Sequence, residues 1–403
     1  MIKLKKVGEL LNLFVKNRVL IYGAGDVASL VCSFAHSSNV EAGVVSFVVS
    51  NVQNNPKEIM GIEVKNFLDL KYDYDKILIA VDESIVDEIA TYIKTYNDVT
   101  TIVYMSNELI NHIRNLEQGT SDRIVLEQCR KIEQAITRLT PRPQLSFSVP
   151  LCEHCNLNCA WCSAFAPLAR EQYLDIVQYE KDIKRLAELS GGDLYKCQLV
   201  GGEPLLNPRA IDYAVITRKA FPRGRISFVT NGLLLKNQTE EFFEKCHEYD
   251  IDIDMTPYPI GADYEKIGEF LADKGIKWKW QNGNAVKKMW KKVFDLNPNT
   301  PEQRSVHNWL NCFAANNCIH LRDGKMMCCV ISSSKNFKDY FPEEARRMYV
   351  SERDYIDIYK VSSIDEIFSF LSKPYPFCKY CNVDGTVSGL DWKKSRKDIT
   401  EWV

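Results

Sequence analysis

The sequence predicts an α/β protein in three parts: an N-terminal parallel sheet, a central parallel α/β barrel or part of one, and a cysteine-rich extension. Three observations predict this class. Short β-branched runs alternate with helical patterns over residues 18–115, the alternation resumes after two prolines near residue 142, and six cysteines follow residue 297. Strands that alternate with helices of about 10 to 15 residues indicate parallel sheets.

These patterns also predict domain boundaries. We expect a nucleotide-binding-like sheet domain at 1–115, a linker helix at 116–142, a partial six-stranded α/β barrel at 143–296 and the extension at 297–403. A chain of 403 residues is long for one domain, so several cores are expected.

Composition argues against two classes of protein, those that bind nucleic acid and those that span a membrane. The chain carries 51 basic and 53 acidic residues, which does not favour nucleic acid as a partner. Its apolar runs, such as "AGVVSFVV", fall short of the roughly 20 residues that cross a bilayer, so no membrane span is expected. The first residues read as a helix and a strand and not as a secretory leader, and we therefore predict a cytoplasmic protein.

The N-terminal runs are "RVLIYGAG", "GVVSFVVS", "KILIAV" and "VTTIVYM". Gly23 and Gly25 stand between the first strand and its helix, where a backbone can approach a phosphate. The second strand ends in "VVSNVQ", without the acidic residue that holds a ribose. A nucleotide site and a purely structural turn both remain open.

The central strands are expected at "QLSFSVP", "YKCQLVGG", "GRISFVTNG", "DIDIDMTPYPI" and "IKWKWQ". In parallel α/β barrels the chemistry lies at the carboxyl ends of the strands. The first of these strands leads directly into "CEHCNLNCAWC". The sequence therefore predicts a cysteine site at that end of the sheet.

Fourteen cysteines in a reducing compartment are better tested as metal ligands than as disulfides. Cys155, Cys159 and Cys162 form a C-x3-C-x2-C pattern. Zinc sites usually take paired C-x2-C units and four ligands, whereas iron-sulfur clusters use closely spaced thiolates on a loop. Three thiolates leave one iron of a four-iron cluster open to a substrate or cofactor. Cys152 could pair with Cys155 around zinc, but we expect it to be a bystander.

The segment "CNLNCAWC" resembles the signature loop of the radical S-adenosylmethionine (SAM) superfamily, and "LVGGEPLLNP" and "FVTNG" extend the resemblance. It implies a [4Fe-4S] cluster on Cys155, Cys159 and Cys162 whose open iron chelates SAM. It also implies an enzyme that cleaves SAM with an electron from a donor such as flavodoxin or ferredoxin and abstracts hydrogen from a substrate C–H bond. The cofactor-binding residues that it implies are Trp161, Gly201, Gly202, Glu203, Thr230, Asn231 and Thr256.

A second resemblance concerns the extension. Cys312, eleven residues, Gly324, four residues and Cys329, followed by Cys378-x2-Cys381, is similar to the twitch domain, the short form of the SPASM domain. The resemblance implies an auxiliary [4Fe-4S] cluster on those four cysteines, with zinc as the alternative metal. Asp323-Gly324 predicts a hairpin turn.

Two further cysteines, Cys318 and Cys328, are alternative ligands of that cluster. If they are not ligands, they are candidate hydrogen-atom donors. A donor thiol would favour epimerisation, whereas an electron-accepting cluster would favour oxidation.

The N-terminal domain resembles the Rossmann-like domains attached to bacterial enzymes of surface-polysaccharide and sugar-nucleotide metabolism. We therefore expect the substrate to be a sugar, a sugar nucleotide or a glycan-linked small molecule. A ribosomal peptide is the alternative substrate, and a non-catalytic iron-sulfur or zinc protein is the alternative class.

Overall fold

The computed structural model describes residues 1–38, 40–69, 74–96, 101–118, 123–284, 286–297, 299–301 and 303–403. The chain divides into two compact units, Met1–Gln144 and Leu145–Val403. The finer division into four parts stays a prediction. Within the described ranges, every helix is too short or too polar to cross a membrane.

The first unit is built on a seven-stranded sheet with the order β1-β7-β6-β2-β3-β5-β4. All neighbouring strands are parallel except β4 and β5, which confirms the predicted N-terminal parallel sheet. The strands are β1 (Ile2–Leu4), β2 (Val19–Tyr22), β3 (Val44–Val49), β4 (Glu58–Ile59), β5 (Ile62–Asn66), β6 (Lys76–Ile79) and β7 (Thr101–Met105). The helices are α1 (Val7–Lys16), α2 (Asp26–Ser37), α3 (Val86–Tyr96), α4 (Asn107–Gln118) and α5 (Arg123–Arg138).

Both faces of this sheet are buried, as its continuous apolar strands require. One core cluster joins the sheet to α1, α2 and α4, with Phe14 and Val31 among its fully buried members. A second cluster joins the other face to α3 through Ile79 and Ile93. The unit is therefore a three-layer α/β arrangement.

The glycine turn of this unit has a structural cause. Gly23 has φ +126, and a Cβ there would lie 2.8 Å from the carbonyl oxygen of Ala80, which directly follows the neighbouring strand β6. Its amide also donates to the carbonyl of Val48 at 2.8 Å. Packing alone explains this glycine, and nucleotide binding stays an untested prediction.

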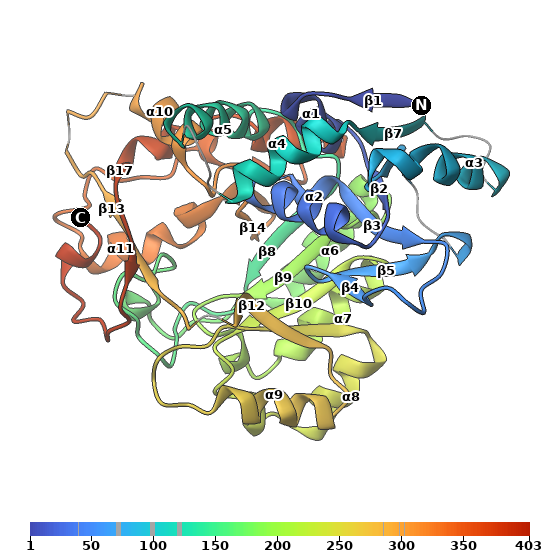
Figure 1. The fold of residues 1–403 in the computed structure, drawn as a ribbon. Coiled ribbons are helices and arrows are strands. Elements are labelled where there is room, and N and C mark those ends of the chain that lie inside the picture. The colour runs from blue at the N-terminus through green and yellow to red at the C-terminus, as the bar shows by residue number, and fades with distance from the viewer. Residues whose placement is uncertain are drawn as a thin grey trace. The chain divides into compact units, whose positions relative to one another are not determined.

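The second unit contains an eight-stranded sheet with the order β12-β11-β10-β9-β8-β14-β15-β16 (Figure 1). The strands are β8 (Ser146–Pro150), β9 (Lys196–Val200), β10 (Arg225–Thr230), β11 (Ile251–Met255), β12 (Trp278–Asn284), β14 (Ile319–Arg322), β15 (Lys325–Cys328) and β16 (Ile356–Asp357). The connecting helices are α6 (Ile176–Ser190), α7 (Ala210–Ala220), α8 (Glu240–Glu248) and α9 (Tyr264–Asp273).

Strands β8 to β12 are parallel and lie where the sequence predicts them. A sixth parallel neighbour is β14, which comes from the C-terminal extension and pairs with β8 through His320 and Ser148. The chain then turns at Asp323-Gly324 into the antiparallel strand β15, as the hairpin prediction states. The extension therefore continues the central sheet.

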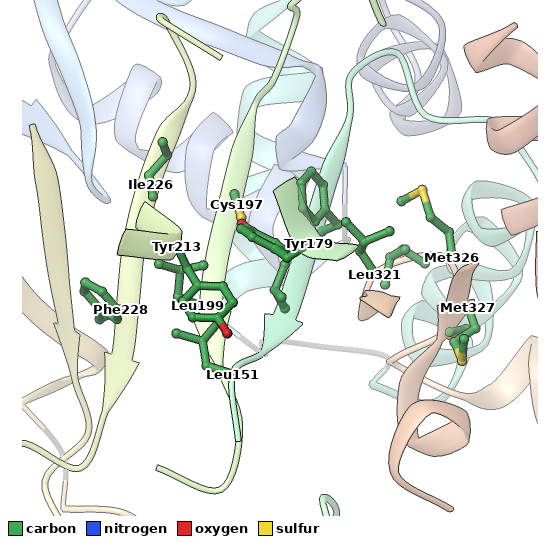
Figure 2. Packing of buried hydrophobic residues seen from close by; sticks show 14 of the residues in the cluster. Leu151, Tyr179, Cys197, Leu199, Tyr213, Ile226, Phe228, Leu321, Met326 and Met327 are labelled. Atoms are coloured by element: carbon green, nitrogen blue, oxygen red, sulfur yellow. The ribbon is translucent and has the colours of Figure 1, made fainter. Parts of the chain in front are cut away.

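The core beneath the helices is visible in Figure 2. Leu199 of β9 and Phe228 of β10 are fully buried, and Tyr179 of α6 and Tyr213 of α7 lie near Leu199. The Tyr179 hydroxyl shares a 2.5 Å hydrogen bond with Thr217. Cys32, Cys197 and Cys246 are buried and pack as small apolar side chains, while the Cys129 side chain lies outside the described residues.

The rest of the extension packs on this sheet. Strand β13 (Met289–Phe294) pairs antiparallel with β17 (Cys381–Leu390) in a separate ribbon. After β17 comes a closing segment, Asp391–Val403, which we call the C-terminal tail. Its penultimate residue, Trp402, is 1% exposed and packs against Phe165 and Phe337. The helices are α10 (Arg304–Asn311), α11 (Ser334–Tyr340) and α12 (Ile364–Leu371).

Candidate functional site

The cysteine loop, residues 151–165, follows β8 at the carboxyl end of the parallel strands. Asn158, Trp161 and Phe165 adopt left-handed backbone angles with φ between 52 and 61. A positive φ is unusual for large side chains such as Trp161, so the surrounding structure must hold this loop in a defined shape.

The three cysteines of this loop lie near enough to one another to interact electrostatically. Burial raises the pKa of the Cys155 thiol to about 12, and the charges of Cys159 and Cys162 raise it further. Burial likewise raises the pKa of Cys159 to about 11. Such thiols ionise only with a strong cationic partner, and a bound metal provides one. Three soft sulfur donors on one loop fit the ligand set of an iron-sulfur cluster.

Gly201 and Gly202 hold the cysteine loop against the end of β9. The Gly202 amide donates to the carbonyl of Cys152 at 3.0 Å, and the Glu203 amide donates to that of His154 at 3.1 Å. A Cβ on Gly202 would lie 2.0 Å from the His154 carbonyl oxygen. The glycines thus permit a close backbone approach between strand end and loop, a role the resemblance did not assign to them.

Cys152 belongs to the same junction. Its thiol donates to the carbonyl of Glu203 at 2.9 Å, and burial raises its pKa to about 12. This contact gives Cys152 a structural partner, and its exclusion from the cluster ligands stays a prediction.

Glu203 is the centre of a buried polar network. Its carboxylate accepts hydrogen bonds from the Thr230 hydroxyl at 2.6 Å and from the Asn231 amide at 2.9 Å. Burial nevertheless raises its pKa to about 7. The Asn231 side chain donates to Asn156 of the cysteine loop at 2.7 Å, and the Thr256 amide donates to the Thr230 carbonyl at 2.9 Å. The predicted residues of three strand ends are therefore joined to the loop.

Two residues near the thiols were missed by sequence reasoning. Burial holds the pKa of Tyr258 well above its usual value, and the three loop cysteines and Glu203 raise it further. Burial lowers the pKa of Lys287, while Cys159 and Cys162 oppose that change. Tyr258 follows β11 in the same way that Glu203 follows β9, which is the signal that could have found it. Lys287 lies in a lysine-rich stretch without a motif.

A second group of cysteines lies in the extension. Cys312, Cys328, Cys378 and Cys381 line one small cavity together with Trp309 and Tyr375. The side-chain amide of Asn308 donates to the carbonyls of Cys378 at 2.8 Å and Cys381 at 2.5 Å, which holds that turn in place. The side chain of Cys329 lies outside the described residues.

The alternative cysteines have different surroundings. The Cys328 thiol is 3% exposed and donates to the carbonyl of Ala314 at 3.1 Å. The Cys318 sulfur lies 3.6 Å from Nε2 of His320. Among the described side chains, no three Cys, His, Asp or Glu converge closely enough for a single metal ion. A four-iron cluster is a different case, because each thiolate binds its own iron and the sulfurs lie farther apart.

Known proteins resemble parts of this chain. GTP 3',8-cyclase of Chlorobaculum tepidum is 33% identical over 90 residues, which are 22% of this chain and 26% of that protein. The chain thus matches about a quarter of that relative's length. A structure of BtrN in complex with AdoMet and 2-DOIA overlaps 59% of this chain and 94% of its own, at 18% identity and a TM-score of 0.37. A structure of anSMEcpe with bound AdoMet overlaps 59% of this chain and 83% of its own, at 12% identity and a TM-score of 0.35.

These structural overlaps are too weak to assign a function. The family evidence is more specific, because residues 149–267 match the family described as the radical SAM superfamily. That range begins at the end of β8 and includes the cysteine loop, the Glu203 network and α8. Over residues 149–267, and with the cysteine loop inside that range, the chain is therefore similar to the radical SAM superfamily.

Proposed function

We propose that this protein is a radical SAM enzyme whose catalytic [4Fe-4S] cluster is held by Cys155, Cys159 and Cys162. The observation that carries the proposal is that these three thiols interact electrostatically with one another and with the buried Glu203 network at the carboxyl end of the sheet. When bound, the cluster and SAM supply one-electron cleavage and hydrogen-atom abstraction, and the protein supplies binding and orientation.

The polar residues around the thiols are suited to SAM. Glu203 offers a buried carboxylate for the SAM ammonium group, and a nearby positive charge would favour its ionised form. Thr230 and Asn231 orient that carboxylate by their hydrogen bonds. Lys287 offers a cation for the SAM carboxylate. Tyr258, which interacts with the three thiols, would help to shield them from water. Trp161 and Thr256 remain candidate contacts of the adenosine part.

We further propose an auxiliary cluster on Cys312, Cys329, Cys378 and Cys381. The shared cavity of three of them supports it. Cys328 lines the same cavity, but its sulfur lies against the Ala314 carbonyl oxygen, which suits a protonated thiol better than a thiolate ligand. This contact favours Cys329 as the fourth ligand. Asn308 would keep the Cys378 turn in its ligating shape.

Oxidation is the reaction that this arrangement favours. Oxidation of an alcohol carbon removes one hydrogen atom, one proton and one electron, and an auxiliary cluster is a suitable acceptor for that electron. Cys328 is buried beside the auxiliary cavity, so it is a poor hydrogen-atom donor for a substrate. Cys318, which is partly exposed beside His320, remains the donor to test if the reaction is an epimerisation.

The proposed substrate is a sugar, a sugar nucleotide or a glycan-linked small molecule. Its support is the N-terminal α/β sheet, which differs from a peptide-recognition module and resembles nucleotide-binding-like domains. A ribosomal peptide remains the alternative. The electron donor would be a flavodoxin or ferredoxin, and the proposed compartment is the cytoplasm.

Deuterium transfer tests the substrate proposal. The reconstituted protein is incubated with SAM, a reductant and candidate sugar nucleotides or peptides that carry deuterium at their carbon positions. Deuterium in 5'-deoxyadenosine from a sugar nucleotide supports the proposal, and deuterium only from a peptide contradicts it. Cys318→Ala separates the reactions, because an epimerase would then stop turning over while an oxidase would continue.

A further inference from the structure

The C-terminal tail lies directly on the cysteine loop, about 230 residues away in sequence. The Ala160 amide donates to the carbonyl of Lys393 at 2.9 Å, and the Ser395 amide donates to the carbonyl of Asn158 at 2.8 Å. Cys159 and Lys394 thereby form an antiparallel bridge. The tail therefore pairs with the backbone around Cys159, the second proposed cluster ligand.

Trp392 makes a side-chain contact with that ligand. Its indole Nε1 donates to the sulfur of Cys159 at 3.0 Å, within the range of a hydrogen bond to sulfur. The neighbouring Lys393 places its ammonium 4.4 Å from the centre of the Trp161 ring, a cation–π contact. Two consecutive tail residues therefore contact the loop on either side of Ala160.

Further contacts hold the tail in place at both of its ends. At its start, Lys288 pairs with Asp391 at 2.5 Å beside the β13–β17 ribbon. At its end, Lys291 donates to the carbonyls of Thr400 at 2.7 Å and Val403 at 2.8 Å. Within it, the buried Glu401 accepts from the Ser395 hydroxyl at 2.6 Å.

The anchor residue of the tail also binds the loop. The indole of Trp402 donates to the carbonyl of Cys162 at 3.0 Å while its ring lies in the aromatic core. This second indole contacts backbone and not sulfur. Of the two tail tryptophans, Trp392 is thus the one whose indole N–H contacts a cysteine sulfur.

We propose that Trp392 is a positioning residue that raises the reduction potential of the cluster on Cys155, Cys159 and Cys162. Hydrogen bonds to ligand sulfurs stabilise the reduced cluster, which carries more negative charge. The inference rests on the proposed function, because it requires that the loop holds a cluster. It goes further by giving the C-terminal tail a role in how readily the cluster accepts the donor's electron.

The test is a redox titration of anaerobically reconstituted full-length protein, followed by electron paramagnetic resonance. The cluster with an open iron is recognised by the change in its signal when SAM is added. Trp392→Phe keeps an aromatic ring but loses the N–H donor, and we expect its midpoint potential to shift to more negative values. Trp290→Phe is the matched control, since Trp290 lies on β13 against Phe313 and should leave the potential unchanged.

Each outcome has a defined meaning. A wild-type protein without a SAM-sensitive signal refutes the proposed function. If wild type shows the signal but Trp392→Phe has the same midpoint potential as wild type, the role of Trp392 is overturned. It is also overturned if Trp290→Phe shifts the midpoint potential as much as Trp392→Phe does. If Trp392→Phe fails to hold iron, wild-type protein labelled with indole-¹⁵N tryptophan decides. A nitrogen coupling to the SAM-sensitive cluster then supports the proposal, and its absence overturns it.

Discussion

The two cysteine groups of this protein differ in what surrounds the sulfurs. The thiols of the cysteine loop lie among polar and ionisable side chains, chiefly Glu203, Tyr258 and Lys287. The group in the extension lines a small cavity with Trp309 and Tyr375 and is held by backbone hydrogen bonds. The first environment suits a cluster that binds a charged cofactor, and the second suits a cluster that only receives electrons.

The largest expected effect comes from removing one ligand of each group. Cys159→Ala should lose the SAM-binding cluster and Cys381→Ala the auxiliary one, so each variant should hold about four irons in place of about eight. Iron analysis after anaerobic reconstitution measures this. A SAM-sensitive signal should survive only in Cys381→Ala. If it survives in both variants, the assignment of the two groups is wrong.

Gly202→Ala should damage the first group alone. The added Cβ would lie 2.0 Å from the backbone carbonyl of His154, so the loop must move away from β9. We expect SAM-cluster iron to fall while auxiliary iron is retained. Gly8→Ala is the control, because a Cβ there meets nothing within 4 Å. Full iron at both sites in Gly202→Ala would contradict the proposed junction.

Glu203 gives a pH-dependent prediction. Its folded-state pKa of about 7 lies above the ordinary value of 4.5, so the folded protein binds this proton more tightly than the unfolded chain. The resulting stability is fully present below about pH 4.5 and is lost as pH rises through about 7. Between about pH 5 and about pH 8, cluster-free wild type should lose on the order of 2 kcal/mol relative to Glu203→Gln.

Urea unfolding at several pH values measures this difference. SAM binding should show the opposite trend, since its ammonium group favours the ionised carboxylate. Binding by the wild type should tighten with rising pH, and Glu203→Gln should lack this dependence. Parallel pH profiles for the two proteins would rule out the role given to Glu203.

The smallest expected effect concerns Asn308. Asn308→Ala removes the two hydrogen bonds to the carbonyls of Cys378 and Cys381, at a cost of about 1–3 kcal/mol. The midpoint of thermal unfolding and the loss of auxiliary iron to a chelator report this. Asn311→Ala is the matched control, because Asn311 is exposed and its side-chain amide donates to the carbonyl of His307 in the same helix. Equal effects in both variants would argue against a specific role for Asn308.

Local patterns predicted much of this structure. The alternation of β-branched runs with helical patterns predicted the positions of β8 to β12, and the Asp323-Gly324 pair predicted a hairpin. Both predictions succeeded because strand periodicity and turn chemistry are local properties. Glu203, Thr230 and Asn231 were implied by the family resemblance, and a general rule accounts for their grouping, since parallel strands bring their carboxyl ends to one edge.

Other features could not be predicted in this way. The bond from Trp392 to Cys159 joins segments more than 200 residues apart, and no periodicity marks it. The same holds for β14, which extends the parallel sheet from within the C-terminal region. The sequence also did not distinguish the roles of glycines that follow strands. Gly23 and Gly202 both follow a strand, but of the two it is Gly202 that packs against the cysteine loop.

The central claim is that the cysteine loop supports radical SAM chemistry. The most direct test is anaerobic incubation of reconstituted wild-type protein with SAM and a strong reductant, followed by chromatography for 5'-deoxyadenosine. We predict its formation by the wild type and by Cys381→Ala, and its loss in Cys159→Ala. A fully loaded wild-type protein that binds SAM but forms no 5'-deoxyadenosine would contradict the claim.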